Sequence, residues 1–174
     1  MINDFHTDEA MNTDKQNRFV SAFHEAGHSV VQKLLGIPLI AARLFDDGGG
    51  HCELQYTPPS PNDSNRAERT VMGLWGGLLA EELFISPTLS AGFPRDSGYD
   101  SDGAQIIALS ATYGGADPLE WAFDLRRKAR VLMLKNLHHV MAVTTDLLKN
   151  GCALPQFGAL GAVEPVNAFS RFSA

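Results

Sequence analysis

The string HEAGH, at residues 24–28, contains two histidines four positions apart with a glutamate directly after the first. Residues i and i+4 of an α-helix lie one above the other, so both imidazoles can face one ion while Glu25 flanks it. Zinc accepts two neutral imidazoles and a carboxylate, with a water as fourth ligand whose pKa falls to about 7. The pattern therefore predicts a zinc site in which His24 and His28 bind the metal and Glu25 takes a proton from the water.

The same five residues also have a simpler interpretation. Histidines on a helix face often bond to main-chain carbonyls or water and need no metal. A third ligand would separate the two interpretations, and the chain offers several acidic or histidine candidates for it: His51, Glu81, Glu82, Asp96, Asp100 and Asp102. Their positions along the chain leave this choice open.

The element that must carry HEAGH is a helix over residues 13–35. Thr13 and Gln16 resemble a capping box, apolar residues then recur at helical spacing, and Gly36 ends the run. We expect the polar residues 1–12 to form a flexible leader. Residues 38–57 are predicted to form a small β-hairpin, because the Asp and Gly residues at 46–50 supply the turn conformations.

A second helix is expected to begin at residues 62–64 and to end before Pro87. Its apolar stripe contains an anomaly, since Glu82 falls inside the stripe and Glu81 at its edge. A carboxylate rarely faces a core without a partner, so at least one of the two should have a cationic or hydrogen-bonding neighbour. The helical wheel favours Glu82 as the more central.

The remaining pattern completes a mainly α fold. A Pro- and Gly-rich loop over residues 85–101 leads to a short helix that begins with Asp102, where the helix dipole alone could explain a carboxylate. One long helix is expected over residues 118–150, with Gly151 as its stop. Its buried side is predicted to comprise Trp121, Leu125, Leu132, Leu137, Val140, Met141, Leu147 and Leu148. Residues 13–155 would form one domain, and 156–174 an irregular tail packed on it.

Composition excludes several classes of function. The 174 residues carry a formal net charge of -6 and have a pI near 5.4, which argues against nucleic acid as a partner. The longest nearly apolar run, at residues 71–80, is shorter than the ~20 residues of a membrane span. The two cysteines show neither a CxxC pattern nor a disulfide framework. We therefore expect a soluble, cytoplasmic protein without a membrane partner.

Three strings, in this order, resemble the FtsH-type zinc metallopeptidase domain: AFHEAGHSVV at 22–31, GGLLAEELF at 76–84 and SGYDSD at 97–102. The family shows a YHEAGHAVV-like helix, a GGRxAEEL-like helix and a TGASND-like turn. The resemblance covers roughly residues 17–155. It departs from the family at Leu78, where the family has Arg, at Ser101, where it has Asn, and in a longer link before the turn.

The resemblance implies a function for each matching position. His24, His28 and Asp102 would bind zinc, Glu25 would be the catalytic base, and Glu81 would orient a ligand histidine, although Glu82 stays open for that role. The family joins its peptidase to a membrane anchor and an AAA ATPase, whereas this sequence has no Gly-Lys dipeptide and hence no P-loop.

The sequence thus predicts an ATP-independent zinc metalloendopeptidase that hydrolyses flexible or unfolded polypeptides. Two alternatives remain open. One is a catalytically silent, zinc-stabilised binding module or adaptor, and the other is a peptidase subunit that works with a separate ATPase. A homo-oligomer is compatible with each of them, because the family assembles as rings.

Overall fold

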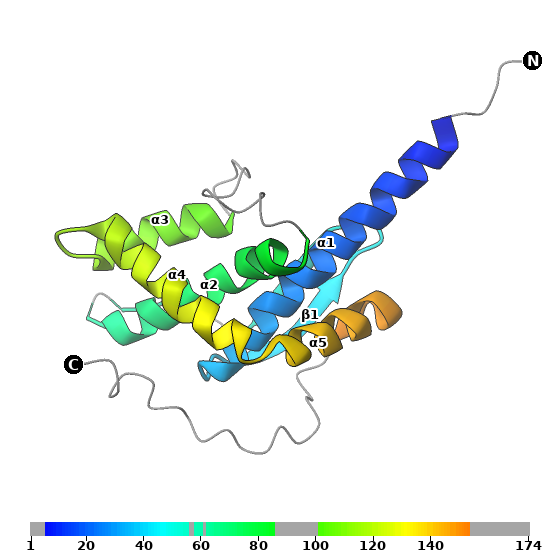
Figure 1. Cartoon of the computed structure of the whole chain (residues 1–174). Coiled ribbons are helices and arrows are strands. Elements are labelled where there is room, and N and C mark those ends of the chain that lie inside the picture. Colours follow the sequence, from blue (N-terminus) through cyan, green and yellow to red (C-terminus); the bar gives the residue numbers. More distant parts are fainter. Residues whose placement is uncertain (1–5, 56–57, 61, 86–100, 154–174) are drawn as a thin grey trace, which may run out of the picture.

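Helix α1, which spans His6–Leu34, runs through the middle of the structure, and its N-terminal turns extend beyond the other elements (Figure 1). The computed structural model describes residues 6–55, 58–60, 62–85 and 101–153. After α1 come strands β1 (Leu39–Leu44) and β2 (Gly50–Leu54), helices α2 (Ser64–Phe84), α3 (Asp102–Tyr113), α4 (Pro118–Leu134) and α5 (Leu137–Asn150), and strand β3 (Cys152–Ala153). The predicted mainly α fold with a small sheet after the first helix is confirmed.

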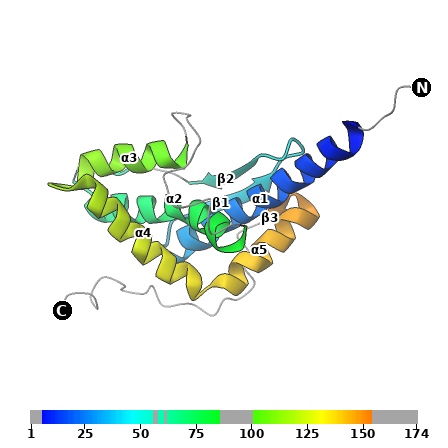
Figure 2. The ribbon, with the colours of Figure 1, turned by 45° about the horizontal axis from the view of Figure 1, so that its top comes forward.

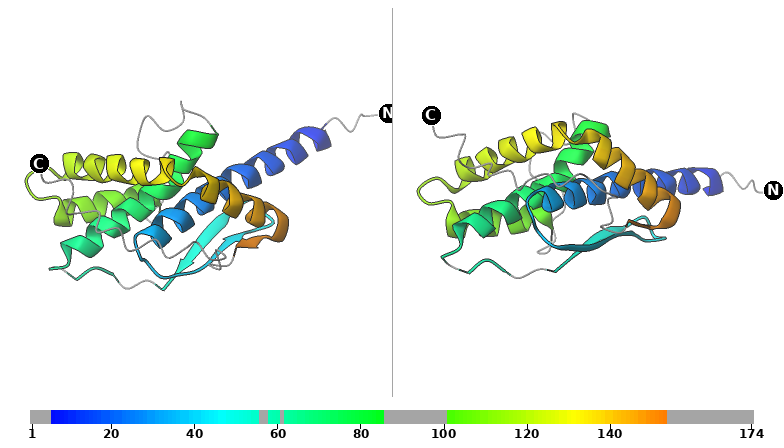
Figure 3. Two further views of the ribbon diagram at one scale, coloured as in Figure 1. Left: turned by 60° about the horizontal axis from the view of Figure 1, so that its bottom comes forward. Right: turned by 90° about the horizontal axis from the view of Figure 1, so that it is seen from below.

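The strands form a small antiparallel sheet in the order β2-β1-β3, on one side of α1 (Figures 2 and 3). The hairpin pairs Ala42 with Cys52 and Leu44 with Gly50, about the turn that the sequence predicts. The sheet packs on one face of α1, and α2 packs along another.

None of the described helices carries an apolar stretch long enough to cross a membrane.

Helices α1 and α2 approach each other closely because glycines face each other at their crossing. A Cβ on Gly27 would collide with the carbonyl oxygen of Gly76, and a Cβ on Gly76 would lie 2.7 Å from that of Gly27. Gly27 is the fourth residue of HEAGH, so this string also contains the contact that sets the helix spacing. The side chains of α1 next to it consequently reach the backbone of α2.

The core is formed where α1, α2, α4 and α5 meet. Its fully buried apolar residues lie on the helix faces that the 3.6-residue period predicts. They include Ala22, Ala26, Val31, Val71, Leu79, Leu125, Met133, Val140 and Leu147. Trp75 is also buried, and its indole Nε1 donates to the Ala122 carbonyl of α4 at 3.1 Å. The core thus holds α1 and α2, which carry most of the site, in a fixed arrangement.

The predicted single helix over 118–150 is wrong, because it breaks at Lys135 and Asn136 into α4 and α5. The Asn136 side chain donates to the Leu132 carbonyl at 2.8 Å, while its own carbonyl accepts from the main chain of His139. The break lets α4 pack on α2 and α5 pack on α1, which one straight helix could not do (Figure 3). As predicted, α5 ends at Gly151, whose φ of 68° is left-handed.

Other differences from the sequence-based expectation are local. Helix α1 begins at His6, so the start expected at Thr13 is wrong, since residues 6–12 contain no Gly or Pro to stop a helix. Met141 is 45% exposed although a buried position was predicted, because it lies about 100° around α5 from the buried Val140. Strand β3 was not expected. Residues 1–5, the loop 86–100 and the tail 156–174 lie outside the described residues.

Candidate metal centre

His24 and His28 project from consecutive turns of α1 toward α2, at a position where α2 has no side chain. A Cβ on Gly77 would lie 2.5 Å from His28 Nε2 and 2.7 Å from His24 Nε2. The glycine therefore leaves room for both imidazole rings between the two helices. The ring centroids are 4.5 Å apart and the ring planes are nearly perpendicular.

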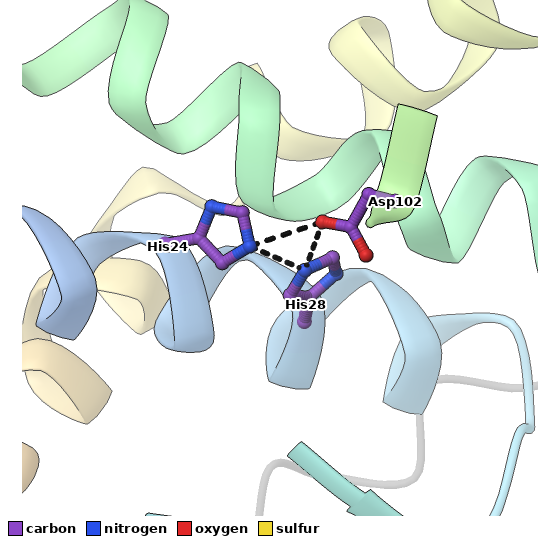
Figure 4. A group of neighbouring side chains, drawn as sticks. All are labelled: His24, His28 and Asp102. Carbon is purple, nitrogen blue, oxygen red and sulfur yellow. Dashed lines mark hydrogen bonds and ion pairs between the residues drawn. The ribbon is translucent and has the colours of Figure 1, made fainter. Parts of the chain in front are cut away.

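Asp102 completes a triangle of ligand atoms with the two histidines (Figure 4). It is the first residue of α3, and the side chain of Ser101 caps this helix by accepting from the Ala104 amide. Asp102 Oδ2 lies 3.0 Å from His24 Nε2 and 2.9 Å from His28 Nε2, and the two Nε2 atoms are 2.9 Å apart. Among the described residues, no other set of three such side chains converges in this way.

The other nitrogen of each ring determines what the converging atoms can do. His28 Nδ1 lies 2.9 Å from the Gly73 carbonyl oxygen, and His24 Nδ1 lies 2.5 Å from Glu81 Oε1. A carbonyl or carboxylate oxygen only accepts, so each Nδ1 carries the hydrogen and each Nε2 of a neutral ring presents a lone pair. Three electron-pair donors thus face one another, an arrangement that requires a cation or a proton between them.

Without a metal, protons supply that positive charge. Burial alone would lower the pKa of His24, but hydrogen bonds to Asp102 and Glu81 outweigh it and raise this pKa to about 10. Burial likewise disfavours charge on His28, yet the carboxylate of Asp102 raises its pKa above the usual value. Burial would raise the pKa of Asp102, but the two rings hold it well below its ordinary range. The centre therefore favours bound positive charge.

The three atoms fit a divalent metal. Two imidazole nitrogens and one carboxylate oxygen suit several first-row transition metals. Metal bonds of about 2.0–2.1 Å would place tetrahedral ligand atoms about 3.3–3.4 Å apart, so the triangle would need to open by about 0.4 Å. A side-chain adjustment of that size is small, and His24, His28 and Asp102 can hold a metal ion.

Glu25 lies beside this centre without being part of the triangle. Its side chain is buried, and its negative charge contributes to raising the pKa of both His24 and His28. On its other side it faces the sheet, where it contacts Gly50 at the start of β2. The carboxylate is thus held between the candidate metal ligands and a strand.

Both carboxylates of the AEE pair have partners, and the partners differ. Glu81 contacts His24, whereas Glu82 Oε2 lies 2.5 Å from a guanidinium nitrogen of Arg126 on α4. Arg126 also lies over the ring of Trp75, 5.6 Å from its centroid. Of the two, only Glu81 contacts a candidate ligand, although the helical wheel placed Glu82 nearer the centre of the stripe.

Of the remaining candidates, His51 is described by the structure and does not join the centre. His51 is exposed on β2, and its strand neighbour Cys52 points to α1, where its thiol donates to the Glu25 carbonyl at 3.2 Å. Burial raises the pKa of Cys52, so it stays a neutral thiol. Asp96 and Asp100 lie outside the described residues.

Sequence reasoning missed the contacts that involve the main chain or glycine. The carbonyl of Gly73 carries no signature in the residue type, and Gly77 and Gly50 are recognisable only once the facing residues are known. Searches of protein-family models and of curated proteins find no match to this chain. The candidate site is therefore defined by its geometry.

Proposed function

We propose that the protein is a zinc-dependent metalloendopeptidase. The observation that carries the proposal is the convergence of three lone-pair donors at His24, His28 and Asp102, with the buried carboxylate of Glu25 beside them. Two imidazoles and one carboxylate are the ligand set of many catalytic zinc sites, in which a fourth position stays open. The resemblance of HEAGH, AEEL and the Asp102 turn to FtsH-type peptidases supports the same assignment.

Each residue then has a defined role. His24, His28 and Asp102 hold the metal. When bound, zinc supplies a water acidified to a pKa of about 7 and polarises the peptide carbonyl. Glu25 would take a proton from the attacking water and deliver it to the leaving amine, acting first as a general base and then as a general acid.

The partners of the two rings support catalysis by fixing their orientation. The Gly73 carbonyl and the Glu81 carboxylate each accept from Nδ1, so they hold both imidazoles in the tautomer whose Nε2 can bind metal. The carboxylate also increases the basicity of His24. We therefore assign Glu81, and not Glu82, as the residue that orients a ligand.

The proposed substrates are flexible or unfolded polypeptides, cleaved without ATP-driven unfolding. Among the described strands, β2 pairs with β1 on one side only, which leaves its other edge unpaired. An extended substrate could add to this edge by main-chain hydrogen bonds, and β2 begins beside Glu25. The hairpin could equally be structural, and peptide-bound structures would distinguish these roles.

Two alternatives differ from this proposal in testable ways. A silent binding module or adaptor would retain the metal ligands but would not need Glu25, which is not a ligand and is nevertheless buried at the site. A subunit that works with a separate ATPase would cleave folded proteins only when that partner is present.

Both cysteines are unpaired, which is compatible with the cytoplasmic location that we propose.

The test compares the wild type with Glu25→Gln. We expect both proteins to bind one zinc ion per chain, and the variant to lose peptide cleavage by about 10²–10⁴-fold, the usual contribution of a general base. An unstructured casein-type substrate and a quenched fluorescent peptide library provide the assay. Equal cleavage by both proteins would remove Glu25 from its role, and a wild type that binds zinc but cleaves nothing would favour the binding module.

A further inference from the structure

Gly50, the first residue of β2, faces the side chain of Glu25. A Cβ built on Gly50 would lie 2.6 Å from Glu25 Cγ, 3.0 Å from Oε1 and 3.1 Å from Cδ. These distances are shorter than ordinary van der Waals contacts, so the Glu25 side chain occupies the space that any other residue at position 50 would fill. The carboxylate and a larger residue 50 cannot both keep these positions.

The backbone does not explain the glycine. Among the described residues the positive-φ glycines are Gly36, Gly48, Gly115 and Gly151, and Gly50 is not one of them. Its backbone lies in a strand and pairs with Leu44, which is a conformation open to every residue type. What requires glycine at position 50 is therefore the neighbouring Glu25, not the conformation of the chain.

The strand is also fastened to α1 around Glu25. Ser21 Oγ donates to the Gly48 carbonyl at 2.6 Å, one helical turn before Glu25. One turn after Glu25, Ser29 Oγ lies 3.3 Å from the thiol of Cys52, and both groups donate to the Glu25 carbonyl. Because the chain is bonded to α1 at Gly48 and at Cys52, on both sides of position 50, it cannot easily move away from α1 to accommodate a side chain there.

We propose that Gly50 is a positioning residue for the catalytic base, which leaves the space that lets the Glu25 carboxylate lie beside the His24, His28 and Asp102 centre. The inference depends on the proposed function, since it concerns how the base of that reaction is held. A methyl group at position 50 would displace the flexible Glu25 side chain, which supplies all three of the atoms nearest to it, and should leave the three candidate metal ligands in place.

The experiment compares Gly50→Ala with Gly49→Ala as the matched control. Gly49 directly precedes β2, and the atoms nearest to a Cβ there belong to the exposed side chains of Asp47 and Phe45, with Asp47 Oδ1 closest at 3.1 Å. We expect Gly50→Ala to bind zinc as the wild type does, to keep its KM, and to lose about 10–100-fold in kcat. Gly49→Ala should match the wild type in all three.

A merely structural effect is separated by two further measurements. In a Glu25→Gln background, Gly50→Ala should cause no additional loss of residual kcat, because the base through which it acts is already gone. In metal-free protein, the ¹³C carboxyl resonance of Glu25, assigned with Glu25→Gln, should shift in Gly50→Ala and not in Gly49→Ala. Loss of zinc by Gly50→Ala, or a kcat equal to that of Gly49→Ala, overturns the inference.

Failure of the proposed function is distinguishable from failure of this inference. If the wild type cleaves no peptide, the proposed function is wrong, and the carboxyl resonance still decides whether Gly50 sets the position of Glu25. If the wild type cleaves peptides and the Glu25 resonance is unchanged by Gly50→Ala, the function stands and the role of Gly50 is refuted.

Discussion

Glu81 and Glu82 provide a matched pair for testing how the candidate metal ligands are oriented. They are adjacent in α2, chemically identical and partly buried, yet Glu81 contacts the Nδ1 of His24 and Glu82 contacts Arg126. If Glu81 orients His24, then Glu81→Gln and Glu81→Ala should weaken zinc binding. Glu82→Gln should leave zinc affinity unchanged and lower only the thermal stability, through the lost ion pair with Arg126.

The magnitude follows from the hydrogen bond that is changed. A hydrogen bond to a charged group contributes about 1.5–3 kcal/mol and a neutral one about 0.5–1.5 kcal/mol. Gln at position 81 keeps a neutral acceptor for His24, so the loss should be about 1–1.5 kcal/mol, or roughly 5–13-fold in zinc affinity. Glu81→Ala removes the acceptor and frees the ring, which should cost about 10–100-fold.

The assay is a competitive zinc titration against a chromophoric chelator at fixed pH, with thermal melting of the metal-free proteins in parallel. The expected order of zinc affinity is wild type equal to Glu82→Gln, then Glu81→Gln, then Glu81→Ala. If Glu82→Gln weakens zinc binding as much as Glu81→Gln does, the orienting role does not belong to the residue that contacts His24. An unchanged affinity in Glu81→Ala would refute the reasoning altogether.

Three further predictions concern the centre and the Cys52 thiol that packs against α1. Asp102→Ala should lower zinc affinity more than Glu81→Ala does, measured in the same titration, because it removes a ligand; the reverse order would mean that Asp102 is not the third ligand. In protein kept metal-free by a chelator, the raised pKa of His24 should stabilise the fold fully below about pH 6.5, and this stability should be lost as the pH rises toward 10. The Tm should therefore fall over this pH range, and a constant Tm would contradict the prediction. Cys52 should react slowly with iodoacetamide at pH 8 until the protein is unfolded, because its thiol is partly buried and hydrogen-bonded and its pKa is raised. Alkylation as fast as in denaturant would contradict its placement against α1.

The elements predicted well from sequence are those with strong local signals. The Asp and Gly residues at 46–50 indicate the hairpin turn, and the end of the Pro- and Gly-rich loop at Asp102 indicates the start of α3. The place of HEAGH inside a helix follows from the apolar periodicity and its end at Gly36. In each case the signal is contained within a few neighbouring residues, so no knowledge of the tertiary structure was required.

The features that were missed depend on residues far apart in the chain. The sequence around the break at Asn136 contains no Gly or Pro that would predict it. The break occurs because α4 and α5 pack on different helices. Strand β3 is two residues long and is defined only by its pairing with β1. The choice between Glu81 and Glu82 could not be made on a helical wheel, because their partners, His24 and Arg126, belong to other helices.

Asp102 is separated from His28 by 74 residues and is the only member of the candidate centre that does not belong to α1. A cation bound there would therefore close a long loop and fasten the first turn of α3 to the α1–α2 pair, much as a crosslink would. Such a clip limits the conformations of the unfolded chain, and its contribution grows with the length of the loop that it closes. A bound metal would thus stabilise the packing of α3 in addition to its proposed role in peptide hydrolysis. Slower amide hydrogen exchange in α3 would report the metal-bound state.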